Sequence, residues 1–428
     1  MNRNIILGTI ALSLLLVLIG ILPQEQAESI GSTNTSKHDR SNSSELIAES
    51  ATTDTKMSQL VSSSNRFGFE LFKQLLAQPE SSDNIFISPN SIAIALSMIR
   101  NGTAGQTLAE MNKVLGLDPL STANVDRSYS QLIETLKTAD VELAIANSLW
   151  INQDLTLKEQ FINNAQNFYQ AQVTNLNFAD TSVTNTINQW VAQNTAGKIS
   201  EIVDAVSPED VLYLINAIYF KGSWTNKFDA DATTQQPFYL QPDSQESVAM
   251  MSQTGDYRYY QNEQFQAIRL PYGEKAQLGM YIFLPTENSS LAALNQQLNL
   301  DNWQNWIEQM RSQAGNISLP KFRLQYDTEL KDILASLGMQ QVFNPSQADF
   351  SAMTDSKVAI DTVKHKAVIE VNEAGTEAAG VTSTGVRITS TVPNNQPFNM
   401  NVDRPFFFAI RDDNTQAILF MGNVKYPK

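Results

Sequence analysis

Histidines, cysteines and paired carboxylates are the side chains that could carry catalysis in this 428-residue chain. Only two histidines occur, His38 and His365, and there is no cysteine. The lack of cysteine excludes thiol catalysis, disulfides and thiolate metal ligands, and two histidines are too few for a histidine-rich metal site. A serine–histidine–aspartate triad would have to use one of these two histidines. We therefore expect no metal and no cofactor.

The surroundings of these residues do not favour catalysis. His38 lies in a polar segment, whereas His365 is followed by the strand-like run KAVIEV. Aspartate and glutamate total 44, so carboxylates are numerous enough for paired-carboxylate catalysis, but no pair has a spacing that distinguishes it from the rest. The sequence therefore predicts a protein that is not an enzyme.

The chain is acidic, with 29 lysines and arginines against 44 aspartates and glutamates and a formal net charge of -15. Such a surface repels phosphate backbones, and no run of basic residues interrupts it. We therefore expect no nucleic-acid partner.

The chain is helical in its first third and strand-like later, which is typical of an α+β fold. Residues 66–76 place five apolar side chains on one helical stripe, namely Phe67, Leu71, Phe72, Leu75 and Leu76. In SPNSIAIALSMI, Ser88 is suited to cap a helix and Pro89 to its first turn.

The later part of the chain predicts a sheet. Residues 211–220, VLYLINAIYF, form an apolar run that only Asn216 interrupts, as expected for a central strand buried on both faces. A short amphipathic helix is expected within residues 322–338, and two strands joined by a turn over residues 404–424.

The N-terminal part divides into two segments. Residues 1–27 carry Arg3 and then an almost entirely apolar run, which fits a cleaved signal peptide or an uncleaved N-terminal membrane anchor. Either one leaves the body of the protein exported, in an extracellular or periplasmic location. Residues 28–56 are rich in Ser and Thr and predict a flexible linker, and residues 57–428 predict one globular domain.

A long stretch of small residues lies near the C-terminus, VIEVNEAGTEAAGVTSTGVRITSTVPNNQPF, residues 368–398. From Thr376 to Ile388, positions of one parity are all small or apolar, while both charged side chains, Glu377 and Arg387, share the other parity. Because alternate residues of a strand face opposite sides of a sheet, this loop could become a strand with one buried face. A low-complexity surface linker is the other interpretation.

The flanking residues favour the strand. The leading strand enters the loop without an intervening turn, and NMNVDRPFFFAIRD anchors the other end in strong β sequence. Insertion beside the leading strand would add backbone hydrogen bonds along about a dozen residues. At about 1 kcal/mol net each, this gain is on the order of 10 kcal/mol, comparable to the stability of a whole domain.

Six segments together resemble the serpins, the serine protease inhibitors. They occur in serpin order and are NIFISPNSIAIALSMI, INQWVAQNTAGKI, LINAIYFKGSWTNKF, HKAVIEVNEAGTEAAG, VDRPFFFAIRD and ILFMGNV. The resemblance covers about residues 57–426 and implies a single domain of three β-sheets and eight to nine helices with an exposed reactive-centre loop. It also implies a suicide-substrate mechanism, in which a target serine protease cuts the loop and stays bound as an acyl-enzyme while the loop inserts into the main sheet.

The resemblance further implies a monomer whose partner is a target serine protease, and whose only possible tie to a membrane is the N-terminal segment. The small residues of the hinge favour an inhibitor. The alternatives are a non-inhibitory serpin that acts as a carrier or chaperone, and an inhibitor of cysteine proteases.

The resemblance assigns site residues one by one. The hinge comprises Glu373, Gly375, Thr376, Glu377, Ala378, Ala379 and Gly380. A polar cluster where the main sheet opens comprises Ser88, Ser91, Asn216 and His365, with Asn188 on a nearby helix and Trp224 near the entry point of the loop.

The bond that the protease cuts follows roughly the seventeenth residue from the hinge glutamate in inhibitory serpins. Counting from Glu373 gives the bond Thr389–Ser390, which suits an elastase-like or broad protease. The bond Arg387–Ile388 is the alternative and suits a trypsin-like enzyme, since a few extra residues around TVPNNQPFNM weaken the count.

Overall fold

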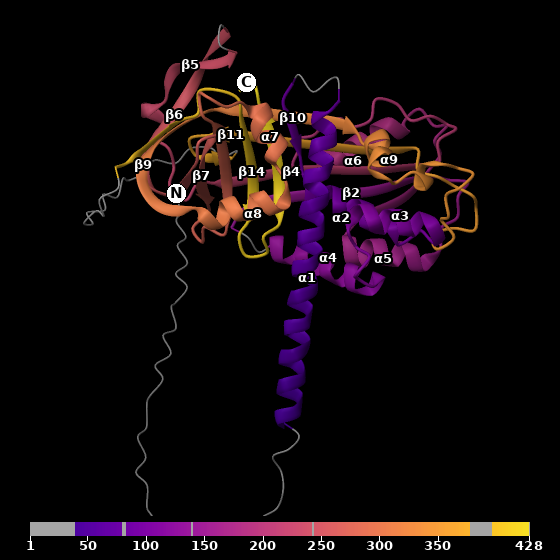
Figure 1. The fold of residues 1–428 in the computed structure, drawn as a ribbon. Helices are drawn as coiled ribbons and strands as arrows, with labels where there is room; N and C mark the ends of the chain where they lie inside the picture. Colours follow the sequence, from indigo (N-terminus) through magenta and orange to yellow (C-terminus); the bar gives the residue numbers. More distant parts are fainter. Residues whose placement is uncertain (1–38, 79–82, 138–139, 242–243, 377–395, 428) are drawn as a thin grey trace, which may run out of the picture. The chain divides into compact units, whose positions relative to one another are not determined.

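Two β-sheets and the helices around them make up the part of the chain that the computed structural model describes (Figure 1). This part is residues 39–427 without 79–82, 138–139, 242–243 and 377–395. The contacts divide the chain after Ser50, and residues 51–428 form one compact unit. The presence of both helices and two large sheets agrees with the expected α+β class.

Nine α-helices and two short 3-10 helices occur in the described residues. The α-helices are α1 (Asp39–Leu76), α2 (Pro89–Arg100), α3 (Gly105–Leu115), α4 (Thr122–Lys137), α5 (Glu159–Tyr169), α6 (Val183–Asn194), α7 (Leu291–Gln297), α8 (Leu300–Gln309) and α9 (Lys331–Leu337). The 3-10 helices are η1 (Ala230–Ala232) and η2 (Gln341–Phe343).

One sheet has six strands in the order β10-β11-β12-β4-β2-β3. We call it the main sheet, because its strand β12 leads into the predicted reactive-centre loop. Its strands are β2 (Glu142–Asn152), β3 (Gln172–Leu176), β4 (Leu212–Ser223), β10 (Phe322–Glu329), β11 (Thr362–Asn372) and β12 (Gly375–Thr376). β11 also pairs directly with β4, in parallel, so the two-residue strand β12 separates them at one end only.

The larger sheet has nine strands in the order β1-β15-β14-β8-β7-β6-β9-β13, with β5 on β6. They are β1 (Ile85–Ile87), β5 (Thr234–Gln241), β6 (Ser244–Gln261), β7 (Phe265–Tyr272), β8 (Leu278–Pro285), β9 (Arg311–Pro320), β13 (Phe398–Asn401), β14 (Phe406–Asp412) and β15 (Ile418–Val424). We expected three sheets, and the described residues form two. The 18-residue β6 pairs with β5 over its first part, with β9 over its second part and with β7 at its end. This long strand joins the two groups of strands into one sheet.

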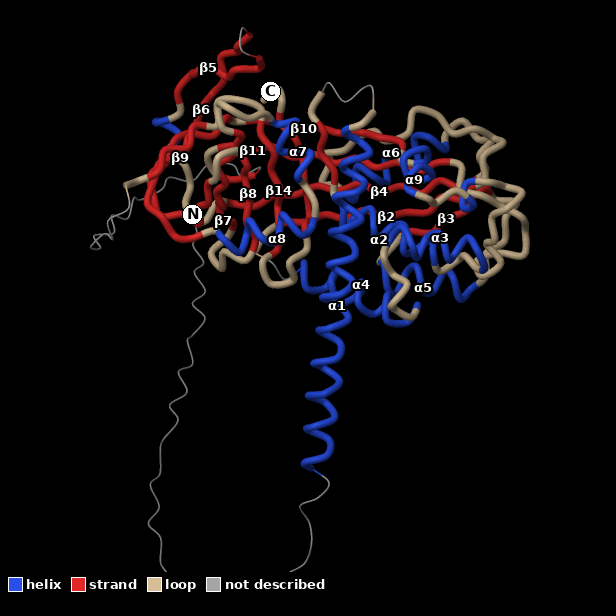
Figure 2. The backbone as a smooth tube through the Cα atoms, in the orientation of Figure 1, coloured by secondary structure: helices blue, strands red, loops and turns tan. Residues whose placement is uncertain are grey.

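The main sheet is covered on both faces. Even-numbered residues of β4, such as Leu212 and Leu214, belong to the large core that α2 shares, whereas Tyr213 and Ile215 pack with Ile187 and Val191 of α6. Because neighbouring residues of a strand point to opposite sides, α2 and α6 lie on opposite faces of this sheet. Figure 2 shows α2 to α5 gathered beside β2 and β3, away from β5 and β9.

Several expectations from the sequence are confirmed. Every residue of β4 from Leu212 to Phe220 is buried, as expected for a central strand. The predicted stripe of α1 packs into the large core, with Leu76 partly exposed. The helix within 322–338 is α9, and the two strands within 404–424 are β14 and β15.

Two expectations are corrected. Helix α1 begins at Asp39, inside the segment 28–56 that we expected to be a flexible linker. This segment contains Glu, Leu, Ala and Lys among its serines and threonines, and extending an existing helix avoids the cost of nucleation. Ser88 does occupy the N-cap of α2, but its hydroxyl makes no capping bond, because it donates to the carbonyl of Leu419 at 2.6 Å.

Candidate functional site

The seam between β11 and β4 is closed along most of its length and wedged open at one end. Thr362 to Val368 pair in parallel with Tyr213 to Tyr219. Beyond this closed seam the two strands diverge, and β12 lies between them, antiparallel to both. Thr376 pairs with Val371 on one side and with Gly222 on the other. A short antiparallel strand thus already enters the sheet from its open end.

The open end is lined by an aromatic pair. The Trp224 and Tyr272 rings stack with their centroids 4.4 Å apart. Trp224 donates from its backbone N–H to the Ala374 carbonyl at 3.1 Å and from Nε1 to the Asn372 carbonyl at 2.9 Å. The fully buried Thr376 shares a 2.7 Å hydrogen bond between its Oγ1 and the Tyr272 hydroxyl. We call Trp224, Tyr272, Gly375 and Thr376 the hinge seat.

Gly375 is the residue that allows the chain to turn into the hinge seat. Its φ of +149° is rare for residues with a side chain, and a Cβ there would lie 2.2 Å from the Gly222 carbonyl oxygen. The turn itself spans Glu373 and Ala374, and the Ala374 N–H donates to Asn372 Oδ1 at 3.0 Å. The expectation that the strand enters the loop without a turn is therefore wrong, because β12 runs back along β11 instead of continuing it.

Glu373 holds the outer side of this turn. Its carboxylate forms an ion pair with Lys321 Nζ at 2.9 Å and accepts a hydrogen bond from Thr233 Oγ1 at 2.8 Å. Partial burial opposes its ionisation, but the hydrogen bonds from Lys321, its own backbone and Thr233 outweigh burial and lower the pKa of Glu373. The carboxylate thus stays charged and tethers the turn to β9 and β10 through Lys321, which joins them.

A buried polar cluster lies under the closed seam. The Nε2 of His365 accepts from the Ser88 backbone N–H at 3.2 Å, so Nδ1 carries the proton and donates to Asn216 Oδ1 at 2.6 Å. The amide nitrogen of Asn216 donates to Ser91 Oγ at 2.5 Å and to Asn147 Oδ1 at 2.6 Å. We call Ser88, Ser91, Asn147, Asn216 and His365 the seam cluster. It ties β11, β4 and β2 to the start of α2.

Burial keeps this cluster uncharged. His365 is completely buried, which lowers its pKa from 6.5 to about 3. Its ring bonds only to an amide oxygen and a backbone N–H, with no carboxylate and no serine hydroxyl as a partner. The described residues therefore hold no serine–histidine–aspartate triad, and His365 serves as a hydrogen-bonding link across the seam.

Comparison with known proteins identifies the fold. The sequence model of the family described as "Serpin (serine protease inhibitor)" matches residues 62–427. The chain belongs to the serpin family. This family is one of inhibitors and not of enzymes, in agreement with the expectation that the chain supplies no catalytic group.

Individual relatives share most of the length of this serpin. An uncharacterized serpin-like protein of Thermococcus kodakarensis is 34% identical over 375 residues, which are 86% of each chain. The human leukocyte elastase inhibitor is 34% identical over 384 residues, 87% of this chain and 100% of the relative. The crystal structure of a thermophilic serpin, tengpin, in its native state superposes with a TM-score of 0.78 and 31% identity, over 86% of this chain and 94% of that one.

The structure brings together most of the site residues that lie in its described part. Ser88, Ser91, Asn216 and His365 meet in the seam cluster, and Trp224 lies against the hinge. Asn188 lies elsewhere, because α6 covers the opposite face of the main sheet. Its side chain bonds to the backbone of Ile202 and Val203, which fixes the chain that follows α6.

Several predicted features lie outside the described residues. These are the hinge residues Glu377, Ala378, Ala379 and Gly380, the candidate bond residues Arg387, Ile388, Thr389 and Ser390, His38, and the signal peptide or anchor at 1–27. In the described part of the serpin, no helix has the length and apolar character needed to cross a bilayer.

Three contributors were missed from the sequence. Asn147 lies directly opposite Asn216 in the β2–β4 ladder, and its position as a lone amide inside the strand-like run LAIANSLW was the available signal. Tyr272 and Lys321 reach the hinge only through strand pairing, so nothing in their local sequence points to this contact.

Proposed function

We propose that this serpin inhibits a serine protease as a suicide substrate, and that the protease cuts the bond Thr389–Ser390. The protease serine would attack the carbonyl carbon of Thr389, the peptide bond would break, and the amine of Ser390 would leave with a proton. Thr389 would then remain esterified to the protease. Insertion of the freed loop into the main sheet would trap this ester before water can hydrolyse it.

The observation that carries the proposal is the position of β12. It lies between β11 and β4, antiparallel to both, and Thr376 is its last described residue. An inserted loop would have this position and this direction. Insertion would therefore extend an existing strand, and it would not have to open the sheet at the point of entry.

The register of β12 indicates where the loop would go. Carried six residues onward, it sets Thr382 opposite both His365 and Asn216, which now pair with each other. Thr382 would therefore enter at the seam cluster, and its hydroxyl could satisfy polar groups that the separation of His365 and Asn216 leaves unpaired.

The sequence of the loop fits this register. Residues of the same parity as Thr376 would face the large core, and they are Ala378, Gly380, Thr382, Thr384, Val386 and Ile388. The charged Glu377 and Arg387 would face the side of α6. No charge would enter the large core, which would remove the main penalty for insertion.

The first test is a panel of serine proteases incubated with the full chain. We expect a covalent complex that survives boiling in detergent with at least one elastase-like enzyme. Cleavage in the loop should also raise the melting temperature by tens of degrees, because a new central strand forms. Cleavage with neither a complex nor a rise in melting temperature would instead favour the carrier or chaperone alternative, and complexes with cysteine proteases alone would favour that class of target.

The mass of the peptide released at the C-terminal side of the cut identifies the bond. A peptide that starts at Ser390 is the expected product. A peptide that starts at Ile388, formed by a trypsin-like enzyme, would move the reactive bond to Arg387–Ile388.

We also propose that the inhibitor acts after export, with residues 1–27 as its signal peptide or anchor. The apolar run after Arg3 supports this location. Fractionation of producing cells tests it, since a protein found in the cytoplasm with residues 1–27 intact would contradict export.

A further inference from the structure

The closed end of the seam, where β11 and β4 both begin, is held by a carboxylate. Asp361 directly precedes β11, and its Oδ2 accepts hydrogen bonds from the backbone N–H groups of Val211 at 2.7 Å and Leu212 at 3.0 Å. The backbone N–H of Asp361 donates in turn to the Leu212 carbonyl at 3.3 Å. We call Val211, Leu212 and Asp361 the seam clamp.

The two sides of the seam clamp belong to different halves of the main sheet. Asp361 is tied to the half that contains β10 and β11, because Lys331 at the start of α9 donates from Nζ to the Asp361 carbonyl at 3.3 Å. Leu212 lies in β4, which pairs with β2, and the Val211 carbonyl accepts from the Asn152 N–H of β2 at 3.0 Å. The clamp therefore bridges the two halves that an inserted strand would separate.

A strand inserted between β11 and β4 along the whole seam would break the seam clamp. Neighbouring strands lie about 4.8 Å apart, so a new strand would move Leu212 away from Asp361 by about this distance. Hydrogen bonds of 2.7 and 3.0 Å do not survive such a displacement. Because a carboxylate accepts them, these bonds are about twice as strong as bonds between neutral groups. Asp361 thus stabilises the seam only while no strand lies within it.

The register of β12 indicates that the clamp would open last. Thr376 of β12 lies opposite Gly222, and Leu212 lies ten residues before Gly222 in β4. A strand that grows from β12 therefore passes the seam cluster at Asn216 before it reaches Leu212. Partial entry leaves the clamp closed, and only complete insertion breaks it.

Asp210 lies next to the clamp in sequence but does not bridge the seam. Its Oδ2 accepts from the Ser207 backbone N–H at 3.2 Å and from the Tyr213 hydroxyl, and both partners lie on the β4 side. An inserted strand would leave these bonds intact. Asp210 and Asp361 are both partly buried and each accepts from two donors, so they differ mainly in whether their bonds cross the seam.

We propose that Asp361 is a positioning residue that keeps the main sheet closed until the reactive-centre loop has been cut. This role rests on the proposed inhibition. Asp361 lowers the free energy of the uninserted state alone, since its partly exposed carboxylate can be hydrated once the clamp opens. A cut loop is free to enter completely, and its new backbone hydrogen bonds outnumber those that the clamp loses.

The melting temperature of the full chain, measured before and after a broad protease such as subtilisin cuts the loop, tests this role. Asp361→Asn keeps the shape of the side chain and one acceptor oxygen but removes the charge. It should lower the melting temperature of the uncut protein by about 2–4 °C and leave that of the cut protein unchanged. Asp361→Ala, which removes both bonds, should give a larger loss, again in the uncut protein alone.

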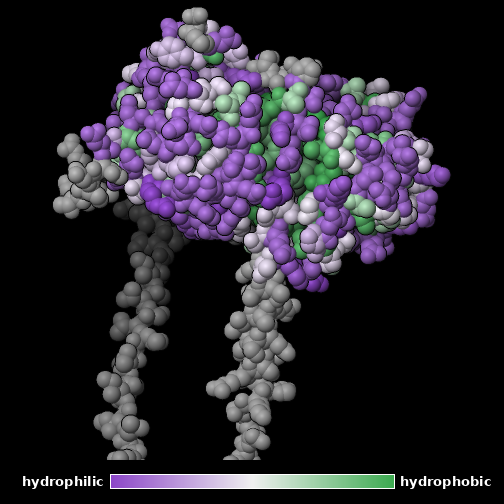
Figure 3. All heavy atoms as spheres, in the orientation of Figure 1, coloured by the Kyte–Doolittle hydropathy of each residue, from purple (hydrophilic) through white to green (hydrophobic). Residues whose placement is uncertain are grey.

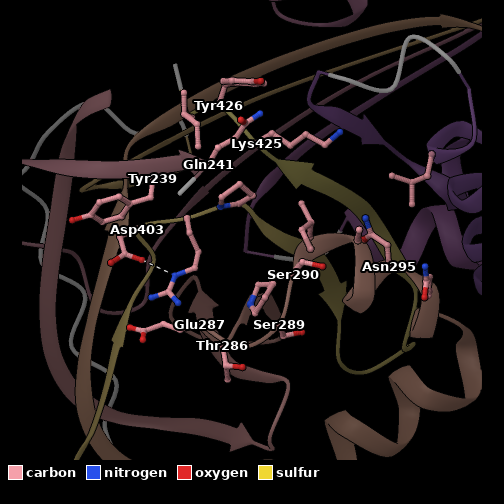
Figure 4. A pocket seen from close by; sticks show the side chains of 18 of the residues that line it. Tyr239, Gln241, Thr286, Glu287, Ser289, Ser290, Asn295, Asp403, Lys425 and Tyr426 are labelled. Atoms are coloured by element: carbon pink, nitrogen blue, oxygen red, sulfur yellow. Dashed lines mark hydrogen bonds and ion pairs between the residues drawn. The ribbon is translucent and has the colours of Figure 1, made fainter. Parts of the chain in front are cut away.

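Two variants serve as controls. Asp210→Asn is the matched control and should lower the melting temperatures of the cut and uncut forms equally. Glu287→Gln controls for the loss of one negative charge from a chain of net charge -15. Figure 4 shows Glu287 at a groove between α1, α7 and β5, in the connection from β8 to α7 and thus outside the main sheet. Glu287 is exposed, and the face of the molecule in Figure 3 is mostly hydrophilic, so both melting temperatures should match the wild type.

The second readout is the rate at which the uncut protein loses its capacity to form covalent complexes during incubation. Complete entry of an intact loop requires the clamp to open. Asp361→Asn should therefore lose this capacity about three- to tenfold faster than the wild type. Asp210→Asn should lose it at the wild-type rate.

The outcomes separate the clamp from the proposed inhibition. Equal losses of melting temperature in the cut and uncut forms of Asp361→Asn would overturn the clamp, because Asp361 would then only cap the start of β11. An uncut Asp361→Asn that melts as the wild type does would also overturn it. Either result, together with a rise in melting temperature when the wild type is cut, leaves the proposed inhibition intact. A wild type whose melting temperature does not rise on cutting would overturn the proposed insertion and the clamp with it.

Discussion

The two ends of the β11–β4 seam are held in different ways. The closed seam rests on the seam cluster, in which neutral side chains exchange hydrogen bonds beneath paired backbones. The open end rests on the hinge seat, in which a stacked aromatic pair holds a two-residue strand in place, and on the ion pair of Glu373 with Lys321 at the outer side of the turn. Neutral side chains of the seam cluster can exchange their present hydrogen-bond partners for groups of an inserted strand. The hinge seat determines where that strand enters. Packing in the hinge seat therefore sets the entry point, and the neutral hydrogen bonds of the seam cluster leave the path beyond it open to a new strand.

The most damaging change to this arrangement is a charge in the hinge seat. Thr376→Arg would bury an unpaired guanidinium where Thr376 is now fully enclosed, at a cost of about 3–5 kcal/mol. We expect β12 to leave the sheet and the protein to become a cleaved substrate. The measurement is the yield of detergent-resistant complex, together with the rise in melting temperature on cleavage, and both should be lost.

Thr376→Val is the matched control for this change. It keeps the volume and removes only the hydrogen bond to Tyr272, which is worth about 1 kcal/mol. This variant should still form complexes. If Thr376→Arg forms them equally well, residues of this parity do not face the core in the inserted state.

The seam cluster should be more sensitive to acid than the hinge seat. The pKa of His365 is lowered to about 3 in the folded protein, so between pH 6.5 and 3 the unfolded chain binds one more proton at this residue. Stability at this residue is complete above pH 6.5 and is lost as the pH falls. From pH 7 to 4.5 the free energy of unfolding should drop by about 2.5 kcal/mol, measured by denaturant titration.

Glu373 does not contribute in the same window. Its pKa is lowered from 4.5, so its stabilisation is present above pH 4.5 and is lost only below that value. His365→Gln should remove the slope above pH 4.5 while lowering stability at pH 7, whereas His38→Gln should keep the slope. A slope that persists in His365→Gln would assign the acid sensitivity to other groups.

The turn into the hinge seat depends on Gly375. Gly375→Ala would place a Cβ against the Gly222 carbonyl and force a φ that residues with side chains avoid, at a cost of about 2 kcal/mol. Gly197→Ala is the control, because Gly197 also has a positive φ but no atom within 4 Å of the added Cβ. Thermal unfolding should show the larger loss for Gly375→Ala. Equal losses would mean that the close approach to Gly222 has no energetic effect.

The sequence predicted the path of the seam better than its ends. Asn216 was recognisable because an amide inside the apolar run of β4 needs a partner, whereas His365 was assigned by the serpin resemblance, and the structure pairs the two residues. Asn188 lies on α6, which covers the opposite face of the main sheet, and a helix in the sequence does not reveal which face of a sheet it will cover. The turn at Glu373 and Ala374 was missed although residues 372–375, NEAG, are all poor strand formers, and Trp224 holds this turn through its bonds to the Asn372 and Ala374 carbonyls. Tyr272 and Lys321 depend on pairings between distant strands, which local sequence does not specify.

The smallest expected effect concerns the ion pair at the outer side of the turn. Glu373 and Lys321 are 2.9 Å apart, with 15% and 41% of their side-chain surfaces exposed, so solvent screens the pair and its coupling should be about 1 kcal/mol. A double-mutant cycle with Glu373→Gln and Lys321→Met measures this coupling from thermal unfolding. The exposed pair Lys137–Glu134 of α4 is the comparison and should give a smaller value. If the two couplings are equal, Glu373 adds nothing specific to the hinge, and the aromatic pair and Gly375 alone hold the open end of the seam.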